Sequence, residues 1–296
     1  MASSVTSSKK AGLMAVKNKG WIKAHKWLLL RRLNQIFILS LFLMGPVFGI
    51  WLVKGNMSSS LILDTLSLTD PFVFIQSLLT GNVAEATALV GALIVFGFYA
   101  LVGGRVYCSW VCPINIITDI ADWFYRKLNS KSPVSLSKNN RYALLLAIFV
   151  VTVVSGSMVW ELVNPVTMLQ RELVFTMGFS WLVILAIFIV DAFISRRAWC
   201  GRFCPMGAFY GLLGRVSLIR VNALNKSACN DCMDCYVVCP EPQVIKPVLK
   251  KGDDLNPVIL AGNCTNCGRC IDICSEDVFS LGMRSAKFID VKNNND

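Results

Sequence analysis

Near its C-terminal end the chain carries two similar runs of cysteines, Cys229-Asn-Asp-Cys232-Met-Asp-Cys235-Tyr-Val-Val-Cys239-Pro240 and Cys264-Thr-Asn-Cys267-Gly-Arg-Cys270-Ile-Asp-Ile-Cys274-Ser275. In both runs two residues separate each of the first three cysteines from the next, and three residues precede the fourth. Three thiolates so closely spaced can wrap one corner of an iron–sulfur cubane, while the fourth reaches a neighbouring cluster. The spacing therefore predicts two [4Fe–4S] clusters.

Because the fourth cysteine of each run binds the cluster of the other run, each cluster has four cysteine ligands. We expect the first cluster to be held by Cys229, Cys232, Cys235 and Cys274, and the second by Cys264, Cys267, Cys270 and Cys239. Ser275 departs from the bacterial ferredoxin pattern, in which a proline that is not a ligand follows the fourth cysteine. A zinc ribbon is the alternative, but it uses two Cys-x2-Cys pairs rather than two runs of four. The predicted module is a small α+β ferredoxin-like domain over residues 221–285.

The composition of the whole chain is that of a membrane protein. Of its 296 residues 55% are hydrophobic and 16% are charged, and the mean hydropathy is +0.57, whereas soluble domains carry about 25% charged residues. The single histidine, His25, argues against a Ser-His-Asp triad, a histidine-rich zinc site and a haem with two histidine ligands.

Four long stretches contain no charged residue: 33–53, 86–104, 142–160 and 173–190. A helix rises about 1.5 Å per residue, so roughly 20 residues cross the hydrocarbon core of a bilayer. Buried helices of a soluble protein are the alternative for any one stretch, but four in succession favour a polytopic α-helical membrane protein. The first stretch is longer than the core of a typical signal peptide, and we interpret it as a retained signal-anchor.

The basic residues give the orientation. Apart from Lys54 and Arg171, every Lys and Arg lies before the first stretch, between the second and third, or after the fourth. The positive-inside rule then places both termini and the ferredoxin module in the cytoplasm, with the chain crossing the bacterial inner membrane four times. The net charge of +11 is therefore a topology signal and predicts no nucleic-acid partner.

The membrane part contains an internal repeat. The segments Arg105-Val-Tyr-Cys108-Ser-Trp-Val-Cys112-Pro113 and Arg197-Ala-Trp-Cys200-Gly-Arg-Phe-Cys204-Pro205 match at identical offsets, and Asp70-Pro71 with Gln76 matches Asn164-Pro165 with Gln170. We expect two parallel helix-pair repeats related by a pseudo-two-fold axis along the membrane normal. The predicted organisation is a basic N-terminus (1–32), repeats over 33–128 and 129–220, the ferredoxin domain (221–285) and a tail (286–296). The first repeat ends in an amphipathic segment.

The remaining cysteines, Cys108, Cys112, Cys200 and Cys204, all lie in these CxxxCP motifs. Two cysteines four residues apart share one helix face, so the four thiols could meet near the pseudo-axis. They could ligate an iron–sulfur cluster or another metal, act as redox thiols, or pack as small apolar side chains. The sequence leaves these alternatives open, although a reducing cytoplasm disfavours disulfides.

A redox partner for the membrane half is inferred by elimination. The chain has no CxxCH motif for a c-type haem, no histidine pair for a Rieske centre, no dinucleotide-binding glycine motif and no P-loop. A quinone is the natural lipid-soluble partner. Candidate quinol-facing groups are Asp70, Gln76, Glu85, Glu161, Gln170 and Glu172. For each of them the alternative is simple solvation. Asp191, near the inner end of the fourth stretch, is a separate candidate, because ionisable groups near membrane depth are often functional. It could instead snorkel or pair with Arg196 or Arg197.

From about residue 20 to 285 the motif set resembles the NapH family, the membrane ferredoxin-type quinol dehydrogenase subunits of the periplasmic nitrate reductase system. The resemblance implies quinol oxidation and electron transfer through a NapG-like periplasmic iron–sulfur protein to nitrate reductase and its cytochromes. The related alternatives are a maturation factor that supplies electrons for metal-centre assembly, as in NosR and cytochrome oxidase assembly proteins, or a membrane redox sensor. The resemblance leaves one difficulty. The predicted clusters lie on the cytoplasmic side of the membrane, whereas the implied electron acceptor lies on the periplasmic side.

Overall fold

The computed structural model describes residues 11–81, 85–128, 137–175, 178–249 and 257–285; the predicted tail, 286–296, lies outside them. The described residues form two compact units. Unit 1 is built from residues within 1–33, 100–110 and 211–296, and unit 2 from residues within 34–99 and 111–210. The first CxxxCP motif lies at the boundary, with Cys108 in unit 1 and Cys112 in unit 2.

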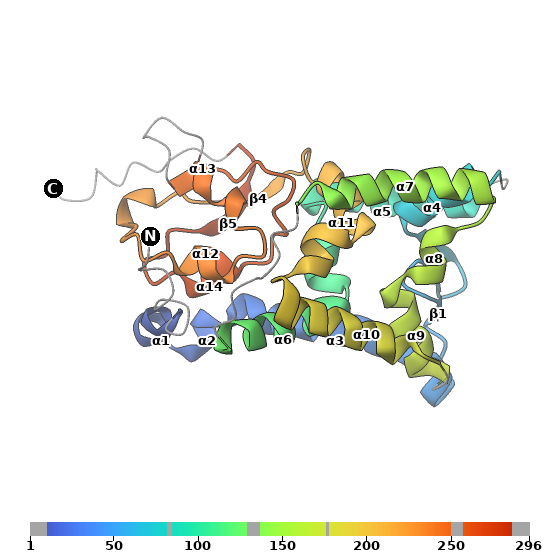
Figure 1. Ribbon diagram of the computed structural model, residues 1–296, viewed down its shortest axis with the longest axis horizontal. Helices are drawn as coiled ribbons and strands as arrows, with labels where there is room; N and C mark the ends of the chain where they lie inside the picture. The colour runs from blue at the N-terminus through green and yellow to red at the C-terminus, as the bar shows by residue number, and fades with distance from the viewer. Residues whose placement is uncertain (1–10, 82–84, 129–136, 176–177, 250–256, 286–296) are drawn as a thin grey trace. The chain divides into compact units, whose positions relative to one another are not determined.

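Unit 1 combines a small sheet with short helices (Figure 1). Its elements are α1 (Leu13–Lys19), α2 (Trp21–Ala24), β4 (Ile219–Asn222), η5 (Lys226–Ala228), α12 (Asp234–Val238), η6 (Pro242–Val244), α13 (Lys246–Leu249), α14 (Arg269–Ile273) and β5 (Ser280–Met283). Strands β4 and β5 pair antiparallel, with Ile219 opposite Met283. Helices α12 and α14 pack side by side.

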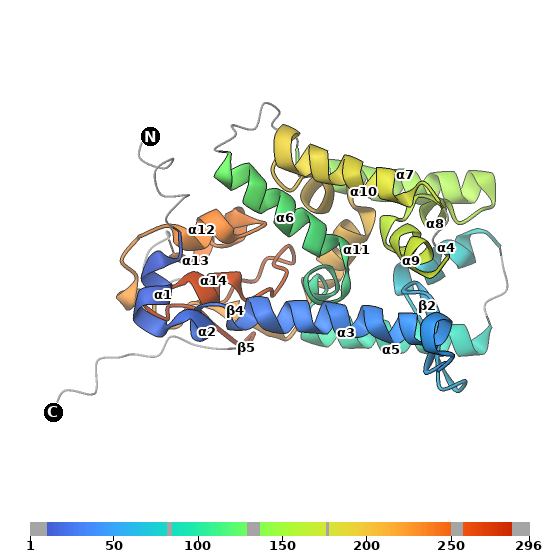
Figure 2. The same cartoon turned by 90° about the horizontal axis from the view of Figure 1, so that it is seen from below.

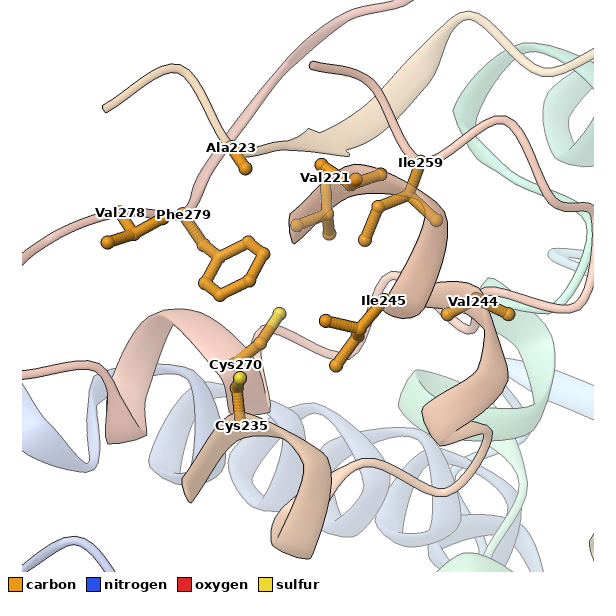
Figure 3. Close-up of a cluster of buried hydrophobic side chains, with 10 residues drawn as sticks. Val221, Ala223, Cys235, Val244, Ile245, Ile259, Cys270, Val278 and Phe279 are labelled. Carbon is orange, nitrogen blue, oxygen red and sulfur yellow. The ribbon is translucent and has the colours of Figure 1, made fainter. Parts of the chain in front are cut away.

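The core of unit 1 joins the sheet to these two helices. Figure 3 shows Val221 and Phe279 from the sheet side meeting Ile245 and Ile259 around two cysteines, Cys235 and Cys270. Because the cysteines are part of the apolar core, the same packing that folds the module also positions its thiols.

Unit 2 contains the long helices. Its elements are most of α3 (Lys26–Phe48), then β1 (Val53–Gly55), β2 (Ser59–Ile62), β3 (Leu66–Thr69), α4 (Pro71–Leu79), most of α5 (Ala86–Val102), α6 (Ile114–Lys127), α7 (Asn140–Ser155), α8 (Val159–Val163), α9 (Pro165–Phe175), α10 (Ser180–Ile189), η3 (Val190–Ile194), η4 (Trp199–Phe203) and the start of α11 (Pro205–Leu213). The π-helix η2 (Tyr107–Val111) joins the two units. The three strands form an antiparallel sheet in the order β1-β2-β3. Figures 1 and 2 both place α6 beside α10.

Among the described residues one helix, Lys26–Phe48, is long and apolar enough to cross a membrane. Three shorter apolar helices, Ala86–Val102, Asn140–Ser155 and Ser180–Ile194, follow it. The charge-free stretches therefore located the apolar helices. Of these helices, only Lys26–Phe48 is as long as a membrane crossing requires.

The predicted span over 173–190 is wrong as a single helix. Helix α9 ends at Phe175 and α10 begins at Ser180, and between them Gly178 has a positive φ of 155°. That conformation is open to glycine and interrupts a helix. The predicted first and third spans are also displaced, since α3 ends at Phe48 and α7 ends at Ser155 before a left-handed Gly156.

The two repeats adopt the same local structures. Both CxxxCP motifs form a five-residue π-helix, η2 in the first repeat and η4 in the second. Both outer Pro/Gln segments form a short helix whose first residue is the proline, Pro71 in α4 and Pro165 in α9. Proline suits this position because the first helical N–H needs no intrahelical partner.

Candidate iron–sulfur and redox sites

Four cysteines drawn from both runs line one cavity in unit 1. Cys229, Cys232 and Cys235 come from the first run, and Cys274 comes from the end of the second. Cys235 lies in the first turn of α12, and Cys274 directly follows α14. Since α12 and α14 pack together, the last cysteine of one run reaches the first three of the other. These are the four residues assigned to the first cluster from the spacing.

A second cavity of unit 1 is lined by the other four cysteines. Cys264, Cys267 and Cys270 come from the second run, and Cys239 follows α12. Cys267 and Cys270 are buried, whereas Cys232 of the first cavity is exposed. The two cavities thus separate the eight cysteines into the two sets predicted from the sequence, and their role as cluster ligands stays a prediction.

The loops that present the thiols are built alike. Asp231 and Met233 in the first loop have φ values of 54° and 64°, and the equivalent Asn266 and Gly268 have 46° and 72°. Left-handed residues turn the backbone sharply, which lets cysteines three apart face the same cavity. Pro240 after the first run cannot continue α12, so the helix stops where Cys239 turns toward the second cavity.

The electrostatics of these thiols fit a positively charged metal cluster. Burial and, to a smaller extent, the neighbouring thiolates raise the pKa of Cys235 to about 12. Burial likewise raises the pKa of Cys264 to about 11. At Cys267 burial also opposes ionisation, but Arg269 and Arg31 outweigh it and lower the pKa. Crowded buried thiolates are costly alone, and bound iron offsets their charge.

The cysteines surround each cavity instead of meeting at one point. Among the described residues no three His, Cys, Asp or Glu side chains lie close enough to hold a single metal ion. A cubane is bound by separate thiolates at separate iron atoms, so a ring of four sulfurs around a cavity is the arrangement that it needs.

The CxxxCP cysteines lie in or directly after the two π-helices, and all four are partly buried. In unit 2, Cys112 packs against the cluster of Ile114, Val166 and Ile187, to which Trp199 of the second motif also contributes. The Cys200 thiol lies 3.9 Å from Thr118 Oγ1, six residues after Cys112. The second motif therefore packs against the residues that follow the first.

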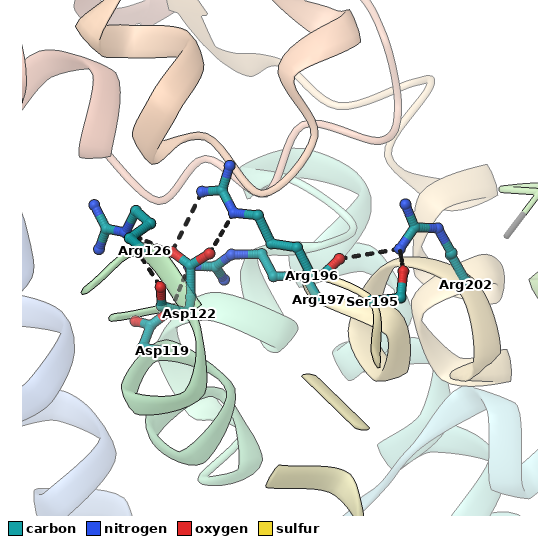
Figure 4. Close-up of polar contacts among 7 residues, drawn as sticks. All are labelled: Asp119, Asp122, Arg126, Ser195, Arg196, Arg197 and Arg202. Atoms are coloured by element: carbon teal, nitrogen blue, oxygen red, sulfur yellow. Dashed lines mark hydrogen bonds and ion pairs between the residues drawn. The ribbon is translucent and has the colours of Figure 1, made fainter. Parts of the chain in front are cut away.

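Charged residues tie the second motif to α6 (Figure 4). Arg197 Nη2 lies 2.9 Å from Asp119 Oδ1 and 3.2 Å from Asp122 Oδ2, and Arg196 also pairs with Asp122. Asp191, for which a pairing with Arg196 or Arg197 was one alternative, accepts a 3.0 Å hydrogen bond from the Trp199 backbone N–H. Sequence reasoning missed Asp119 and Asp122 because acidic residues on an amphipathic helix are usually solvated.

The equivalent arginine of the first repeat has a different partner. Within unit 1, Arg105 Nη1 lies 2.7 Å from Glu241 Oε1, and both side chains are 2% exposed. The same nitrogen donates to the Asn263 carbonyl at 3.1 Å. Neither Arg105 nor Glu241 was singled out from the sequence, although the match of Arg105 with Arg197 was visible.

Four of the predicted quinol-facing residues belong to a buried polar network in unit 2. Asp70 caps α4 by accepting from the Phe72 N–H at 2.8 Å, and Tyr210 donates to its other oxygen at 2.7 Å. Burial raises the pKa of Asp70 to about 6, against the lowering effect of the Tyr210 hydrogen bond. Ser58 links Asp70 to Glu161, because its carbonyl accepts from the Asp70 N–H and its hydroxyl donates to Glu161 at 2.7 Å.

The two glutamines at matching positions of the repeats each contact the other repeat. Gln76 of the first repeat accepts from the Trp160 N–H of the second at 3.2 Å. Gln170 of the second repeat accepts from the Met57 N–H of the first at 3.0 Å and donates to the Gly55 carbonyl. Glu85, by contrast, is exposed, and Glu172 Oε2 is buried without a hydrogen-bond partner among the described residues.

Comparisons with known proteins agree with the cysteine pattern. A family model described as a 4Fe-4S binding domain matches residues 86–131 and 177–224, the segments that contain the two CxxxCP motifs. A second model, a 4Fe-4S dicluster domain, matches residues 228–280. No solved structure matches the chain.

Several curated proteins are similar over almost the whole chain. The ferredoxin-type protein NapH of Escherichia coli is 47% identical over 93% of this chain and 95% of its own length. NapH of Haemophilus influenzae is 44% identical over 93% of this chain and 96% of its own. The methylamine utilization ferredoxin-type protein MauN of Paracoccus denitrificans is 49% identical over 91% and 95%. With its 4Fe–4S domains and this similarity, the chain belongs to the family of ferredoxin-type electron-transfer proteins that includes NapH and MauN.

Proposed function

We propose that the chain is the membrane electron-transfer subunit of a quinol dehydrogenase, which oxidises quinol and passes electrons through an iron–sulfur partner toward periplasmic nitrate reductase. The observation that carries the redox part is the separation of eight cysteines into two cavities, each with the four-thiol donor set of a [4Fe–4S] cluster. When bound, these clusters supply one-electron redox chemistry, and the chain's part is to hold and insulate them.

The proposal includes four membrane spans in the bacterial inner membrane, with the ferredoxin domain in the cytoplasm. Its support is the long apolar helix α3 and the three shorter apolar helices of unit 2. Their side chains are widely exposed, as with Phe37 at 61%, Leu146 at 66% and Val154 at 82%. Large exposed apolar surfaces indicate contact with lipid or another protein.

We place quinol oxidation at the buried polar network around Asp70. Oxidation of a quinol to a quinone releases two electrons and two protons, so the site needs a proton acceptor that is ionised near neutral pH. Asp70, with a pKa of about 6, has that property. The side-chain nitrogens of Gln76 and Trp160 are buried without hydrogen-bond partners among the described residues, so both can donate to quinone oxygens.

We assign the CxxxCP cysteines Cys108, Cys112, Cys200 and Cys204 to a redox role in the transfer of electrons from quinol to the clusters. The support is the 4Fe-4S binding family model, which covers both motifs. Two π-helices at matching positions add to it, because such helices are frequent at functional sites.

A second candidate is electron transfer in methylamine utilization. It is favoured by the MauN of Paracoccus denitrificans, which is as similar to this chain as the NapH proteins are. Both candidates use the same clusters and differ in the final partner. They are separated by testing whether the purified protein, once reduced, passes electrons to the iron–sulfur partner of a nitrate reductase.

The experiment that tests the proposal is anaerobic. The full chain is purified in detergent, its iron and sulfide are measured, and quinol is added while the clusters are followed by EPR, with and without the iron–sulfur partner. Reduction of the clusters by quinol is the expected result. Intact clusters that quinol never reduces, even with the partner present, would overturn the proposal and favour a maturation factor or a redox sensor.

A further inference from the structure

The two halves of the ferredoxin module are equivalent in sequence and backbone but differ in their surroundings. The loop of the first cavity, residues 230–233, is exposed. The equivalent loop of the second cavity, residues 265–268, is buried throughout. The difference cannot come from the cysteine spacing, which is the same in both.

The buried loop is covered by the segment that contains the first CxxxCP cysteine. Ser109 Oγ donates to the Thr265 carbonyl at 2.7 Å, and Trp110 Nε1 donates to the Asn266 carbonyl at 3.1 Å. These bonds lie within unit 1. Thr265 adjoins Cys264 and Asn266 adjoins Cys267, so segment 105–110 is fixed to the backbone beside two of the four cysteines.

Arg105 anchors the same segment at a second place. Its guanidinium pairs with Glu241 and donates to the Asn263 carbonyl. Glu241 stands two residues after Cys239, and Asn263 immediately precedes Cys264. The ion pair is fully buried, and removal of one partner from such a pair leaves an uncompensated charge.

The N-terminal residues of the chain complete the cover. Trp27 lies against Gly268, where an added Cβ would stand 2.4 Å from its ring. The Trp27 and Trp110 rings meet edge to face with centroids 6.0 Å apart. The second cavity therefore has a built contact with the Cys108 segment, and the first cavity opens where Cys232 is exposed.

We infer that the two clusters have fixed and different roles. The inner relay is the set Cys239, Cys264, Cys267 and Cys270, whose cluster would receive electrons from quinol one at a time, along the first CxxxCP segment that Arg105, Ser109 and Trp110 hold against it. The outer relay, at Cys229, Cys232, Cys235 and Cys274, exchanges them with a water-soluble redox protein. This inference rests on the proposed function for its electron donor, quinol, which gives up two electrons and two protons as it becomes quinone, one electron at a time to the inner relay.

One test uses full-length protein in detergent with one relay removed. In Cys232→Ser the inner relay remains, and we expect quinol to reduce it at the rate of the unmodified protein. In Cys267→Ser only the outer relay remains, and we expect its reduction by quinol to slow at least tenfold. Equal rates in the two variants, or faster reduction of Cys267→Ser, would overturn the inference. If quinol reduces neither the unmodified protein nor the variants, the proposed function fails instead.

A second readout needs no quinol. In a redox titration followed by EPR, Arg105→Gln removes the positive charge beside the Glu241 carboxylate, so the midpoint potential of the inner relay should fall while that of the outer relay stays unchanged. Arg105→Gln with Glu241→Gln should restore most of the shift. Arg284→Gln, in which the lost guanidinium donates to the exposed Arg215 carbonyl, should move neither potential.

Equal shifts of both potentials, or a shift of the outer one alone, would contradict the assignment. If Arg105→Gln fails to fold, Ser109→Ala removes the hydrogen bond to Thr265 without unpairing a charge. Ser109→Ala should slow quinol reduction of the inner relay in the Cys232→Ser background and leave iron content unchanged. An unchanged rate in that background would also count against the inference.

Discussion

At the scale of single residues, the pKa of a buried carboxyl depends on the charged side chains around it. Asp122 is 1% exposed, and burial alone would raise its pKa. Arg197, Arg196 and Arg126 outweigh burial and hold the pKa well below its usual range. A carboxyl whose pKa is lowered on folding stabilises the protein above the unfolded pKa, near 4, and that contribution is lost as pH falls toward the folded pKa.

Asp122→Asn should therefore destabilise the protein by about 3–5 kcal/mol near neutral pH, because it removes the buried carboxylate that Arg197, Arg196 and Arg126 share. Thermal unfolding in detergent measures the effect, and the difference from the unmodified protein should shrink as pH falls below about 4. Asp64→Asn is the matched control, since its pair with Lys54 is exposed and such pairs contribute little. Comparable losses in both variants would contradict the prediction.

The contribution of Asp70 to stability changes with pH in the opposite direction to that of Asp122. Its pKa is raised by burial from 3.8 to about 6, so its protonated form favours folding below pH 4, and this stabilisation is lost as pH rises through about 6. Asp70→Asn keeps a side chain that caps helices well and matches Asn164 of the second repeat. Unfolding temperatures should depend less on pH between 4 and 7 in the variant.

The same substitution tests the quinol site. Asp70→Asn removes the proposed proton acceptor, so quinol-linked reduction should fall by about 10²–10⁴-fold, with iron content unchanged. In the unmodified protein the rate should rise with pH through about 6, as the carboxylate forms. Glu85→Gln, a substitution of an exposed carboxyl, is the control. An unchanged rate of quinol-linked reduction in Asp70→Asn would show that Asp70 is not the proton acceptor.

At the scale of elements, the sequence located helices better than it bounded them. Absence of charge found α3, α5, α7 and α10, because apolar runs are the strongest helix signal here. The break at Gly178 and the early end of α7 at Gly156 depend on backbone conformations that hydropathy does not report. The pairing of α12 with α14 was implied by the crossing of the fourth cysteine, whereas the covering of one loop by segment 105–110 had no local signal.

Helix α3 begins on the ferredoxin module, and this junction can be tested. Asp272 of α14 accepts hydrogen bonds from the Trp27 and Leu28 N–H groups, which caps the start of α3. Nearby, Gly268 has a φ of 72° and no room for a Cβ beside Trp27. Gly268→Ala should lower both iron content and unfolding temperature, because backbone strain and a steric clash add.

The control is Gly97→Ala, since Gly97 lies in α5 with nothing within 4 Å of an added Cβ. Alanine is also the better helix former, by about 1 kcal/mol. Gly97→Ala should leave iron content unchanged. Normal iron content in Gly268→Ala would show that the loop tolerates a side chain beside Trp27.

At the scale of the whole molecule, four crossings predict which loops face each side of the membrane. Reporter enzymes fused after residue 138 or at the C-terminus should be active on the cytoplasmic side, and reporters fused after residue 56 or 178 on the periplasmic side. The reason is that the basic residues cluster in the segments of the first two positions, whereas the other two segments contain only Lys54 and Arg171. Activity of the residue-56 and residue-138 fusions on the same side would rule out four crossings.

The cysteine sets were easier to predict from the sequence than the buried polar network. The spacing of eight cysteines alone predicts two sets of four, and the same two sets line two cavities of the structure. The buried polar network could only be suggested, since Tyr210, Ser58 and Trp160 reach it through tertiary packing. The same is true of Arg105 and Glu241, which are 136 positions apart in the chain.

The bonds of Gln76 and Gln170 have a consequence for how the chain can be divided. Each amide accepts from a backbone N–H of the other repeat, so a chain cut between the repeats loses one of these acceptors on each side. The two halves should therefore be stable only when they are produced together.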